Sequence, residues 1–393
     1  MKRVAIIGGG PAGAFAAEQL ARAGLLVQLY DEKLAWEKPC GGGLTYKAYS
    51  QYPFLLENST PKRFITETVL GAPGGGEASL HLSDPLLIYA RLDLNRMLLE
   101  RADRGGAQIE KARVREMTRY GSRWEIRTSS GIADADFCVL ATGARNPLKQ
   151  MGTELRAQDA MSALGYYVAG EQARIDIQFL PKLEGYIWIF PRCGHLSVGI
   201  CGKNEPAASL RQRLERYMSE RGISWKGASF YSHLLPSLDT ASWRRNRVAG
   251  DGWMAVGDAA GLVDPITGEG LYYAIRSGDL AAQAILSEAG ERLEAQYRKL
   301  LRHDFMGDLE FGSRLAKRIF RGRFLFGSVP QRMVEFTRRS PRFAAIIQDL
   351  FAGRQPYEGL KRRLLQNLNG SLYDISMSMG FRRLVPGRAA AKP

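Results

Sequence analysis

The stretch Gly8-Gly9-Gly10-Pro11-Ala12-Gly13 decides the fold of the N-terminal part of this 393-residue chain. An apolar run at residues 3–8 precedes it and predicts a buried strand, and the residues at 11–23 have the apolar spacing of a helix. Residues 26–31 form a second apolar run, which completes a βαβ unit. The spacing GxGxxG between a strand and a helix is typical of dinucleotide-binding sites.

The small residues of this stretch have separate roles in such a site. Gly8 permits the tight turn, Gly10 lets the backbone approach a pyrophosphate, and Gly13 lets helix and strand pack closely. The helix that carries Ala12 directs the positive end of its dipole at the phosphates. A merely structural glycine turn is the alternative interpretation.

An acidic residue follows at the position that dinucleotide sites require. Asp31 ends the second predicted strand, 23 residues after Gly8, where a carboxylate can accept the ribose hydroxyls. Glu32 is the rival for this role. With strand, helix and acid in register, dinucleotide binding is the favoured interpretation.

Length and composition indicate a globular protein of two domains, or of one domain with a large insertion. Apolar residues make up 45% of the chain and charged residues 24%, which excludes a disordered chain. Four cysteines form neither a CxxC pair nor a cluster with metal-ligand spacing, so we expect no disulfide, no metal and a cytoplasmic location: Cys40, Cys138, Cys193 and Cys201. No apolar run reaches the roughly 18 residues of a membrane span.

The positive charge gathers at the C-terminal end. The net charge is +15, and residues 291–393 hold 21 Lys or Arg against 9 Asp or Glu. Apolar residues interrupt the basic ones at Ile319, Phe320, Phe324, Leu325 and Phe326, which favours a surface for anionic lipid on the inner face of a membrane, or for an anionic substrate. A solvated basic face is the alternative, and no base-reading motif indicates nucleic acid.

The patterns along the chain predict an α/β fold. We expect a Rossmann-type domain in two parts, at residues 1–150 and 246–290, an inserted antiparallel substrate domain at 151–245, and a basic helical region at 291–393. Helices are predicted at 91–104, 207–221 and 270–289. Strands are predicted at 136–140, 175–179, 186–190, 196–200 and 253–256, and an antiparallel ribbon around Gly121. Glycine-rich loops are expected at 41–43 and 74–76.

A second glycine-rich block indicates which dinucleotide binds. Gly257-Asp258-Ala259-Ala260-Gly261 is followed by Pro265 and by Gly268-Glu269-Gly270-Leu271. This block resembles the flavin-contacting motif of the p-hydroxybenzoate hydroxylase-like flavoproteins, which implies FAD, with Asp258 at its ribityl chain or pyrophosphate. A helix that starts near Gly270 would offer backbone N–H groups to the anionic edge of a reduced flavin. A plain helix start is the alternative.

Three further residues match the same superfamily. Arg91 stands where the superfamily has an arginine at the start of a helix, Val114 where it has a backbone contact to adenine, and Gly143 in its ATG turn, here Ala141-Thr142-Gly143. The resemblance implies FAD contacts for all three, although each alone could be an ordinary residue.

Four segments resemble the geranylgeranyl reductase family. Tyr186-Ile187-Trp188-Ile189-Phe190-Pro191, with Gly199 downstream, is similar to its YxWxFP and GxG motifs, and Pro39-Cys40-Gly41-Gly42-Gly43 to its cysteine-containing loop beside the flavin. The segments Leu350-Phe351-Ala352-Gly353 and Tyr357-Glu358-Gly359-Leu360-Lys361 resemble its C-terminal region. Cys201 replaces the second glycine of GxG, and Leu183 stands where many members have proline. Flavin halogenases carry a related WxWxIP, which this chain matches less well.

The aromatic segment offers its own physical argument. Tyr186, Trp188 and Phe190 alternate on a predicted strand and therefore share one face, which is either sheet core or the wall of an apolar cavity. The surrounding flavin motifs favour the cavity. We expect these three residues to line the substrate site, and Cys40, Tyr186 and Trp188 to take part in catalysis.

The resemblance implies a reductase that saturates C=C bonds of an isoprenoid chain on a lipid, quinone, pigment or diphosphate, with hydride from reduced FAD. Cys40 or Tyr186 would donate the proton. The electron donor is open between NADPH, ferredoxin and another carrier, because no second nucleotide fingerprint is present. One alternative is an FAD monooxygenase of an aromatic substrate, and another a non-enzymatic prenyl-binding protein related to Rab GDP-dissociation inhibitors.

Overall fold

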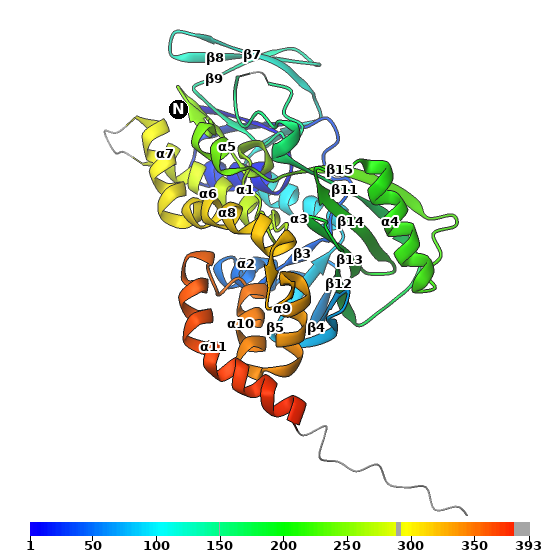
Figure 1. Ribbon diagram of the computed structural model, residues 1–393. Helices are drawn as coiled ribbons and strands as arrows, with labels where there is room; N and C mark the ends of the chain where they lie inside the picture. The colour runs from blue at the N-terminus through cyan, green and yellow to red at the C-terminus, as the bar shows by residue number, and fades with distance from the viewer. Residues whose placement is uncertain (149, 288–291, 381–393) are drawn as a thin grey trace, which may run out of the picture.

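A computed structural model of the chain describes residues 1–148, 150–287 and 292–380. Two large sheets, a small ribbon and a layer of C-terminal helices make up the structure (Figure 1). This arrangement confirms the predicted α/β class, with its Rossmann-type part, antiparallel-sheet region and helical C-terminal region. Within the described ranges no helix is long and apolar enough to cross a membrane.

The first sheet has six strands in the order β16-β17-β10-β1-β2-β6. All neighbours pair in parallel except β16 and β17 at one edge. Its strands are β1 (Arg3–Ile7), β2 (Leu26–Tyr30), β6 (Gln108–Glu110), β10 (Phe137–Leu140), β16 (Ala249–Gly250) and β17 (Trp253–Ala255). Parallel strands are buried on both faces, which explains why β1 and β10 read as continuous apolar runs.

Three helices accompany this sheet: α1 (Pro11–Arg22), α3 (Arg91–Arg104) and α6 (Leu271–Leu286). Helix α1 packs against both α3 and α6, so the N-terminal and the downstream glycine-rich blocks become neighbours. The contact is tight, because a Cβ added at Gly278 in α6 would lie 2.4 Å from the carbonyl oxygen of Ala12. The helix predicted at 270–289 starts one residue later, and residues 288 and 289 lie outside the described ranges.

The predicted ribbon around Gly121 is present and has three strands: β7 (Val114–Tyr120), β8 (Arg123–Thr128) and β9 (Ile132–Ala135). Gly121 makes the turn between the first two with φ +59°. This left-handed conformation favours glycine and explains the tight connection.

The second sheet has eight strands in the order β15-β11-β14-β13-β12-β4-β5-β3. Its pairs are antiparallel except β12 with β4. The strands are β3 (Gly43–Leu44), β4 (Lys62–Ala72), β5 (Gly76–Tyr89), β11 (Ala160–Val168), β12 (Arg174–Phe179), β13 (Gly185–Pro191), β14 (Leu196–Lys203) and β15 (Ser229–Pro236). Three of them precede residue 150, so the sheet draws on both segments that the sequence analysis separates there.

The sequence analysis predicted no strand at β4, β5, β11 or β15. The alternation of apolar and polar residues expected of a strand is irregular in the β4–β5 hairpin. The strand register shifts between Ile65 and Glu67, and Asp84-Pro85 lies within β5. Proline removes a ladder hydrogen bond and therefore argues against a strand. The predicted loop at 74–76 is the turn of this hairpin.

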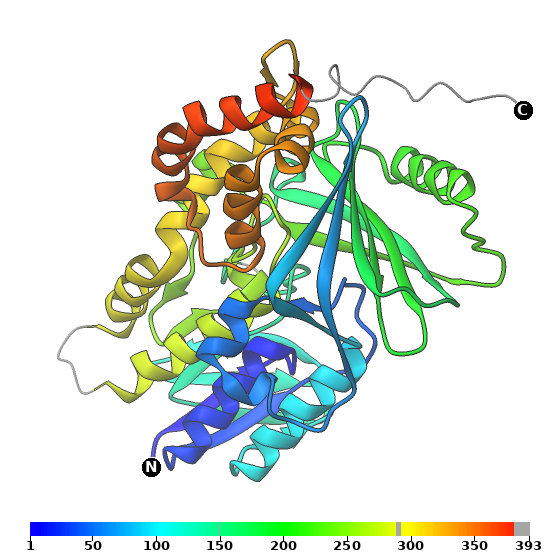
Figure 2. The same ribbon diagram turned by 90° about the horizontal axis from the view of Figure 1, so that it is seen from below.

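Helices α4 (Ala207–Glu220), α9 (Val329–Arg339) and α10 (Pro341–Phe351) cover the second sheet. Helix α4 packs on β11 and β14, and α9 and α10 pack on β5 (Figure 2). The other helices are α2 (Tyr46–Gln51), α5 (Thr240–Arg245), α7 (Leu293–Leu301), α8 (Gly307–Arg321) and α11 (Tyr357–Gly380), and a short hairpin joins α8 to α9. Of the predicted basic region, residues 291 and 381–393 lie outside the described ranges.

Candidate active site

The N-terminal glycine stretch forms an open cradle. Gly8 has φ +109°, and a Cβ there would lie 2.3 Å from the carbonyl oxygen of Ala141. A Cβ at Gly13 would lie 2.0 Å from the carbonyl oxygen of Gly8. Gly10, by contrast, has no atom within 4 Å of such a Cβ, and no side chain caps the helix that it begins. Backbone N–H groups at the start of α1 are thus free to face a phosphate.

Asp31 faces this cradle. Its Oδ2 accepts a hydrogen bond from the N–H of Gly9 at 2.7 Å, and its Oδ1 accepts from Lys33 and Leu34 at 2.7 and 2.6 Å. The rival Glu32 lies at the surface, 3.7 Å from Arg113. The geometry therefore favours Asp31 over Glu32 as the acidic residue of the site.

The downstream block lies beside the cradle. A Cβ at Gly257 would be 3.4 Å from the Cβ of Ala12, and the N–H of Gly257 donates to Ser277 Oγ at 2.8 Å. Asp258 pairs with Lys38 Nζ at 3.0 Å, and His233 Nε2 lies 4.0 Å away. Burial raises the pKa of Asp258, but Lys38 and His233 outweigh it and hold this pKa below its usual range. Asp258 is therefore an anion.

The residues matched to the flavoprotein superfamily lie around the first sheet. Arg91 begins α3 and is buried, and its Nη2 donates to Asn95 Oδ1 at 3.2 Å. Its Nε has no hydrogen-bond partner among the described residues. Val114 is buried at the start of β7, and Gly143 has φ +77° with open space around it. A buried cation with a free donor fits an anionic ligand.

A buried arginine fixes the Cys40 loop. The side chain of Arg192 has no exposed surface, and its Nη1 lies 2.6 Å from Glu37 Oε1 while its Nη2 donates to the carbonyl oxygen of Cys40. Glu37 also accepts from the N–H groups of Arg91 and Leu92, at 3.1 and 2.9 Å, and so caps α3. The roles of Glu37 and Arg192 could not be predicted from the sequence, because no sequence pattern pairs residues that lie so far apart.

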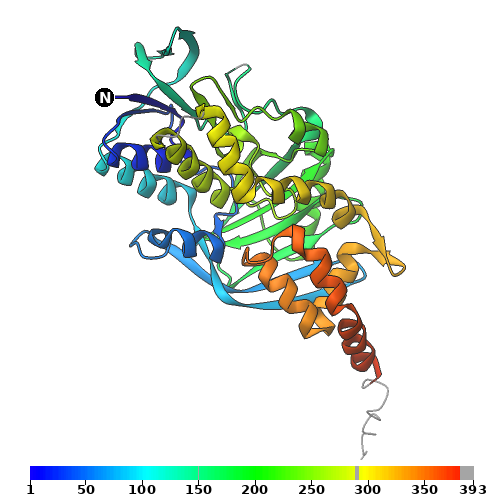
Figure 3. The ribbon, with the colours of Figure 1, turned by 90° about the vertical axis from the view of Figure 1, so that its left-hand side faces the viewer.

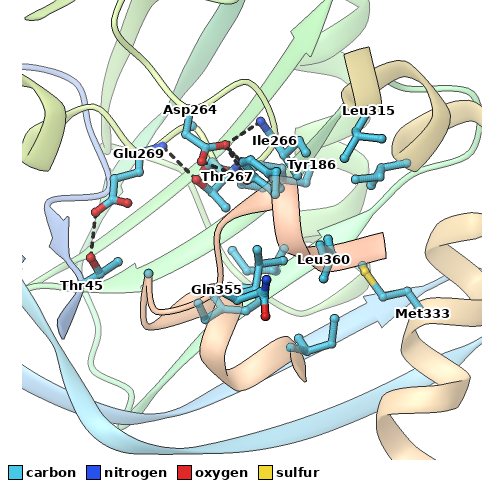
Figure 4. Close-up of a pocket in the computed structure, with 18 of the residues that line it drawn as sticks. Thr45, Tyr186, Asp264, Ile266, Thr267, Glu269, Leu315, Met333, Gln355 and Leu360 are labelled. Carbon is cyan, nitrogen blue, oxygen red and sulfur yellow. Dashed lines mark hydrogen bonds between the residues drawn. The ribbon is translucent and has the colours of Figure 1, made fainter. Parts of the chain in front are cut away.

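A cavity of about 1070 Å³ lies between the second sheet and the C-terminal helices (Figure 4). The structure places the three aromatic residues expected in the substrate site in its wall: Tyr186, Trp188 and Phe190. Ile175, Ile177 and Phe179 of β12 extend this apolar wall, and side chains of α8 to α11 close the far side. Six of the predicted flavin contacts also line the cavity: Cys40, Gly41, Gly43, Gly268, Gly270 and Leu271. The other predicted contacts lie at the cradle and around the first sheet.

Most of the surface that lines this cavity is apolar, and three polar groups cluster near the downstream block (Figure 4). Asp264 is saturated by the N–H groups of Ile266 and Thr267 and by the hydroxyl of Tyr357. Tyr186 donates its hydroxyl proton to the carbonyl oxygen of Thr267, and burial raises its pKa well above 10.

Glu269 is the third polar group. The sequence indicated no separate role for it beyond its place in Gly268-Glu269-Gly270-Leu271. Its Oε1 accepts a hydrogen bond from Thr45 Oγ1 at 2.9 Å. Burial raises the pKa of Glu269 to about 7, although the Thr45 hydroxyl opposes this rise. The cavity thus contains a carboxyl group that is partly protonated at neutral pH.

Comparisons with known proteins agree with these features. Residues 2–164 match the family model described as pyridine nucleotide-disulphide oxidoreductase. The chain is 30% identical to a menaquinone reductase of Mycobacterium tuberculosis, over 74% of this chain and 78% of that protein. It is 27% identical to the chloroplastic geranylgeranyl diphosphate reductase of Arabidopsis thaliana, over 76% and 69% respectively.

The chain belongs to the geranylgeranyl reductase family. It is an FAD-dependent oxidoreductase, so the non-enzymatic alternative loses its basis. A geranylgeranyl bacteriochlorophyll reductase-like protein of Thermoplasma acidophilum shares the fold, with a TM-score of 0.77, 21% identity and coverage of 93% of this chain and 98% of that one. A flavin-dependent brominase shares it with a TM-score of 0.69 and 18% identity, over 95% and 99%.

The residues of this geranylgeranyl reductase family member fit FAD. The Gly10 cradle is open at the start of α1, and the buried Arg91 retains a donor without a partner in the described part of the chain. Both features suit the pyrophosphate of a dinucleotide. The cavity meets the Cys40 loop and the Gly268 block, where the sequence analysis places the flavin ring.

Two glycine variants separate folding from FAD binding. Gly13→Ala forces a Cβ against a backbone carbonyl and should destabilise the FAD-free protein by about 1–3 kcal/mol. The Cβ added in Gly10→Ala would contact no protein atom, and the backbone at this position is extended. The FAD-free variant should therefore keep the wild-type melting temperature. It should nevertheless weaken FAD binding by roughly tenfold or more, or ~1.4 kcal/mol, because its methyl group would stand in the cradle. Thermal melts and calorimetric FAD titrations measure both effects, and unaltered FAD affinity of Gly10→Ala would contradict the assignment.

Removing the counter-charge of Arg192 should destabilise the protein. Glu37→Gln leaves the buried guanidinium without a carboxylate, at a cost of about 1–3 kcal/mol. The matched control is Glu77→Gln, which breaks the exposed pair with Arg221 and should cost at most about 0.5 kcal/mol. Urea unfolding compares the two variants. Equal unfolding midpoints would show that the buried pair stabilises the protein no more than the exposed pair does.

Proposed function

We propose that this enzyme saturates C=C bonds of an isoprenoid chain carried by a lipid, a quinone, a pigment or a diphosphate. The observation that carries the proposal is the apolar cavity, which runs from the Cys40 loop and the Gly268 block to the C-terminal helices. A cavity of this kind suits a long hydrocarbon with few polar groups. Relatives named for reduction of geranylgeranyl diphosphate, of digeranylgeranylglycerophospholipid and of menaquinone support it.

The residues that would hold FAD form four groups. They are Gly8, Gly10, Ala12 and Gly13 of the cradle, Asp31, Arg91 and Asp258 beside it, Val114 and Gly143 near the first sheet, and Cys40, Gly41, Gly43, Gly268, Gly270 and Leu271 at the cavity end. Reduced FAD, when bound, supplies the hydride. The uncapped N-terminus of α6 offers backbone N–H groups that stabilise negative charge there.

The protein itself must supply the proton. An isolated alkene is a poor hydride acceptor, so protonation of one carbon has to develop positive charge on its neighbour before the second C–H bond forms. The faces of Tyr186 and Trp188 can stabilise this charge. The apolar wall excludes water that would otherwise capture the cation. One proton and one hydride add across the double bond, which balances the reaction.

We propose Glu269 as the proton donor in place of Tyr186. The Tyr186 hydroxyl donates to a backbone carbonyl, and its raised pKa makes it a weaker acid. Glu269 faces the same cavity, and burial places its pKa at about 7, near the optimum for general acid catalysis at neutral pH. Cys40 remains the other candidate, because its thiol lies in the same cavity wall.

The pH dependence of single turnover tests this role. The wild-type rate should fall as pH rises through about 7, because the carboxyl then loses its proton. Glu269→Gln should lower the rate by roughly 10²–10⁴-fold and abolish this fall. Thr45→Val removes the hydrogen bond that lowers the pKa of Glu269, so the falling limb should move to higher pH. A wild-type rate in Glu269→Gln, with loss of turnover in Cys40→Ala or Tyr186→Phe, would return the role to those residues.

Anaerobic turnover tests the proposed function itself. Dithionite-reduced protein is mixed with geranylgeranyl diphosphate or menaquinone, the flavin absorbance is followed, and products are weighed by mass spectrometry. Saturated products with flavin reoxidation are expected. The monooxygenase alternative predicts the opposite outcome, in which the flavin reoxidises only with oxygen and a phenolic substrate stimulates oxygen-coupled NAD(P)H oxidation.

A further inference from the structure

The hairpin between α8 and α9 presents bare apolar side chains to solvent. Strands β18 (Arg323–Phe324) and β19 (Gly327–Ser328) flank Leu325 and Phe326, and this turn projects from the helical layer (Figure 3). The side chain of Phe326 is 97% exposed, with Leu325 and Phe324 at 45% and 44%. Isolated exposed apolar residues are common, but three consecutive ones at a projecting tip indicate a binding surface.

The backbone of this tip is strained. Leu325 and Phe326 have φ +46° and +64°, the left-handed pair of a tight two-residue hairpin turn. Asn and Gly favour that turn, whereas bulky residues with positive φ are rare outliers. Strain of this kind persists where the surrounding structure fixes it, and it gathers at functional sites.

A neighbouring side chain supplies that fixation. Arg332 of α9 donates from Nε and Nη2 to the carbonyl oxygen of Leu325, at 3.0 and 2.7 Å, and pairs with Glu335. Ser328 follows the turn and caps α9 by accepting from the N–H of Gln331 at 3.2 Å. The hairpin is therefore held in a defined conformation that leaves Leu325 and Phe326 exposed to solvent.

Unpaired positive charge surrounds the tip. Lys317, Arg318 and Arg321 are exposed in the last turns of α8, and Arg323 begins the hairpin. None of these four forms an ion pair with any residue in the described ranges. Basic residues next to exposed aromatic and aliphatic side chains are typical of segments that bind the interface of an anionic bilayer.

The hairpin also forms part of the cavity wall. Ile319, Phe324 and Val329 line the cavity, and so do the cations Arg318 and Arg323. The apolar space beside the Cys40 loop is thus continuous with the segment that carries the exposed tip. An isoprenoid chain that entered here would pass from the apolar interior of a bilayer into the apolar cavity.

We propose that Phe324, Leu325 and Phe326 insert into the surface of an anionic lipid bilayer, while the cations around them bind its headgroups. The cavity then receives its isoprenoid chain from the bilayer. Bilayer binding stands on the hairpin alone, whereas the entry of a prenyl chain rests on the proposed function. The enzyme would accordingly work at the inner face of a membrane.

Vesicle flotation of the full-length FAD-bound protein tests the contact. The wild type should float with vesicles of phosphatidylcholine and phosphatidylglycerol, float far less with phosphatidylcholine alone, and detach in high salt. The decisive variant is Leu325→Asn with Phe326→Gly, which removes the apolar side chains and supplies residues that favour this turn. It should lose at least about tenfold in vesicle partitioning, or ~1.4 kcal/mol, without a fall in melting temperature.

Matched controls distinguish the outcomes. Ile132→Thr removes another exposed apolar side chain, 68% exposed, from β9, and this variant should float like the wild type. The Leu325→Asn, Phe326→Gly variant should keep its activity on detergent-dispersed substrate, whereas its activity on vesicle-embedded substrate should fall. Failure of the wild type to float with anionic vesicles, or equal flotation of the variant, would overturn the proposal whatever the catalytic result. Lipid-free self-association that the Leu325→Asn, Phe326→Gly variant abolishes would overturn it too, by making a second copy the occupant.

Discussion

The guanidinium of Arg192 has no contact with solvent, so its charge must be satisfied inside the protein. Glu37 and the carbonyl oxygen of Cys40 do this, and Glu37 simultaneously caps α3 of the nucleotide-binding part. The Arg192 guanidinium therefore connects the end of β13 with the Cys40 loop and, through Glu37, with the start of α3. Gly42 fits this arrangement because its φ is +81° and a Cβ would lie 2.1 Å from the carbonyl oxygen of Tyr89. The position of the loop relative to both sheets follows from this constraint.

The polar and apolar groups of the site lie mostly on opposite sides of the Cys40 loop. Charged and hydrogen-bonding groups gather where α1, α6 and the Asp258 block meet, which suits the dinucleotide. Beyond the Cys40 loop the walls are mainly apolar, and Glu269 lies at the boundary with a raised pKa. An enzyme that adds a proton and a hydride to an unactivated alkene needs this combination of a dry cavity and a neutral acid. At the other end of the cavity, Arg323 and Phe324 of the basic hairpin line its wall and are also exposed at the protein surface.

Local patterns predicted much of this structure. The glycine stretch, its flanking strand and helix, and the aromatic alternation at Tyr186 and Trp188 depend on neighbours in sequence, so their conformation could be inferred. The β4–β5 hairpin could not, because its bulge and Pro85 disguise the period of two. Contacts between distant residues also escaped prediction. Arg192 and Glu37 stand 155 positions apart, and the acidity of Glu269 depends on burial that no sequence pattern reports.

Isotope transfer from the cofactor tests whether the flavin hydride enters the isoprenoid chain. The apoprotein is reconstituted with reduced 5-deaza-FAD dideuterated at C5, a position that does not exchange with water, and allowed one anaerobic turnover with geranylgeranyl diphosphate or menaquinone. We expect a product with one deuterium and one solvent-derived hydrogen across a former double bond of the isoprenoid chain. A saturated product without deuterium, or deuterium found elsewhere while the chain stays unsaturated, would contradict it.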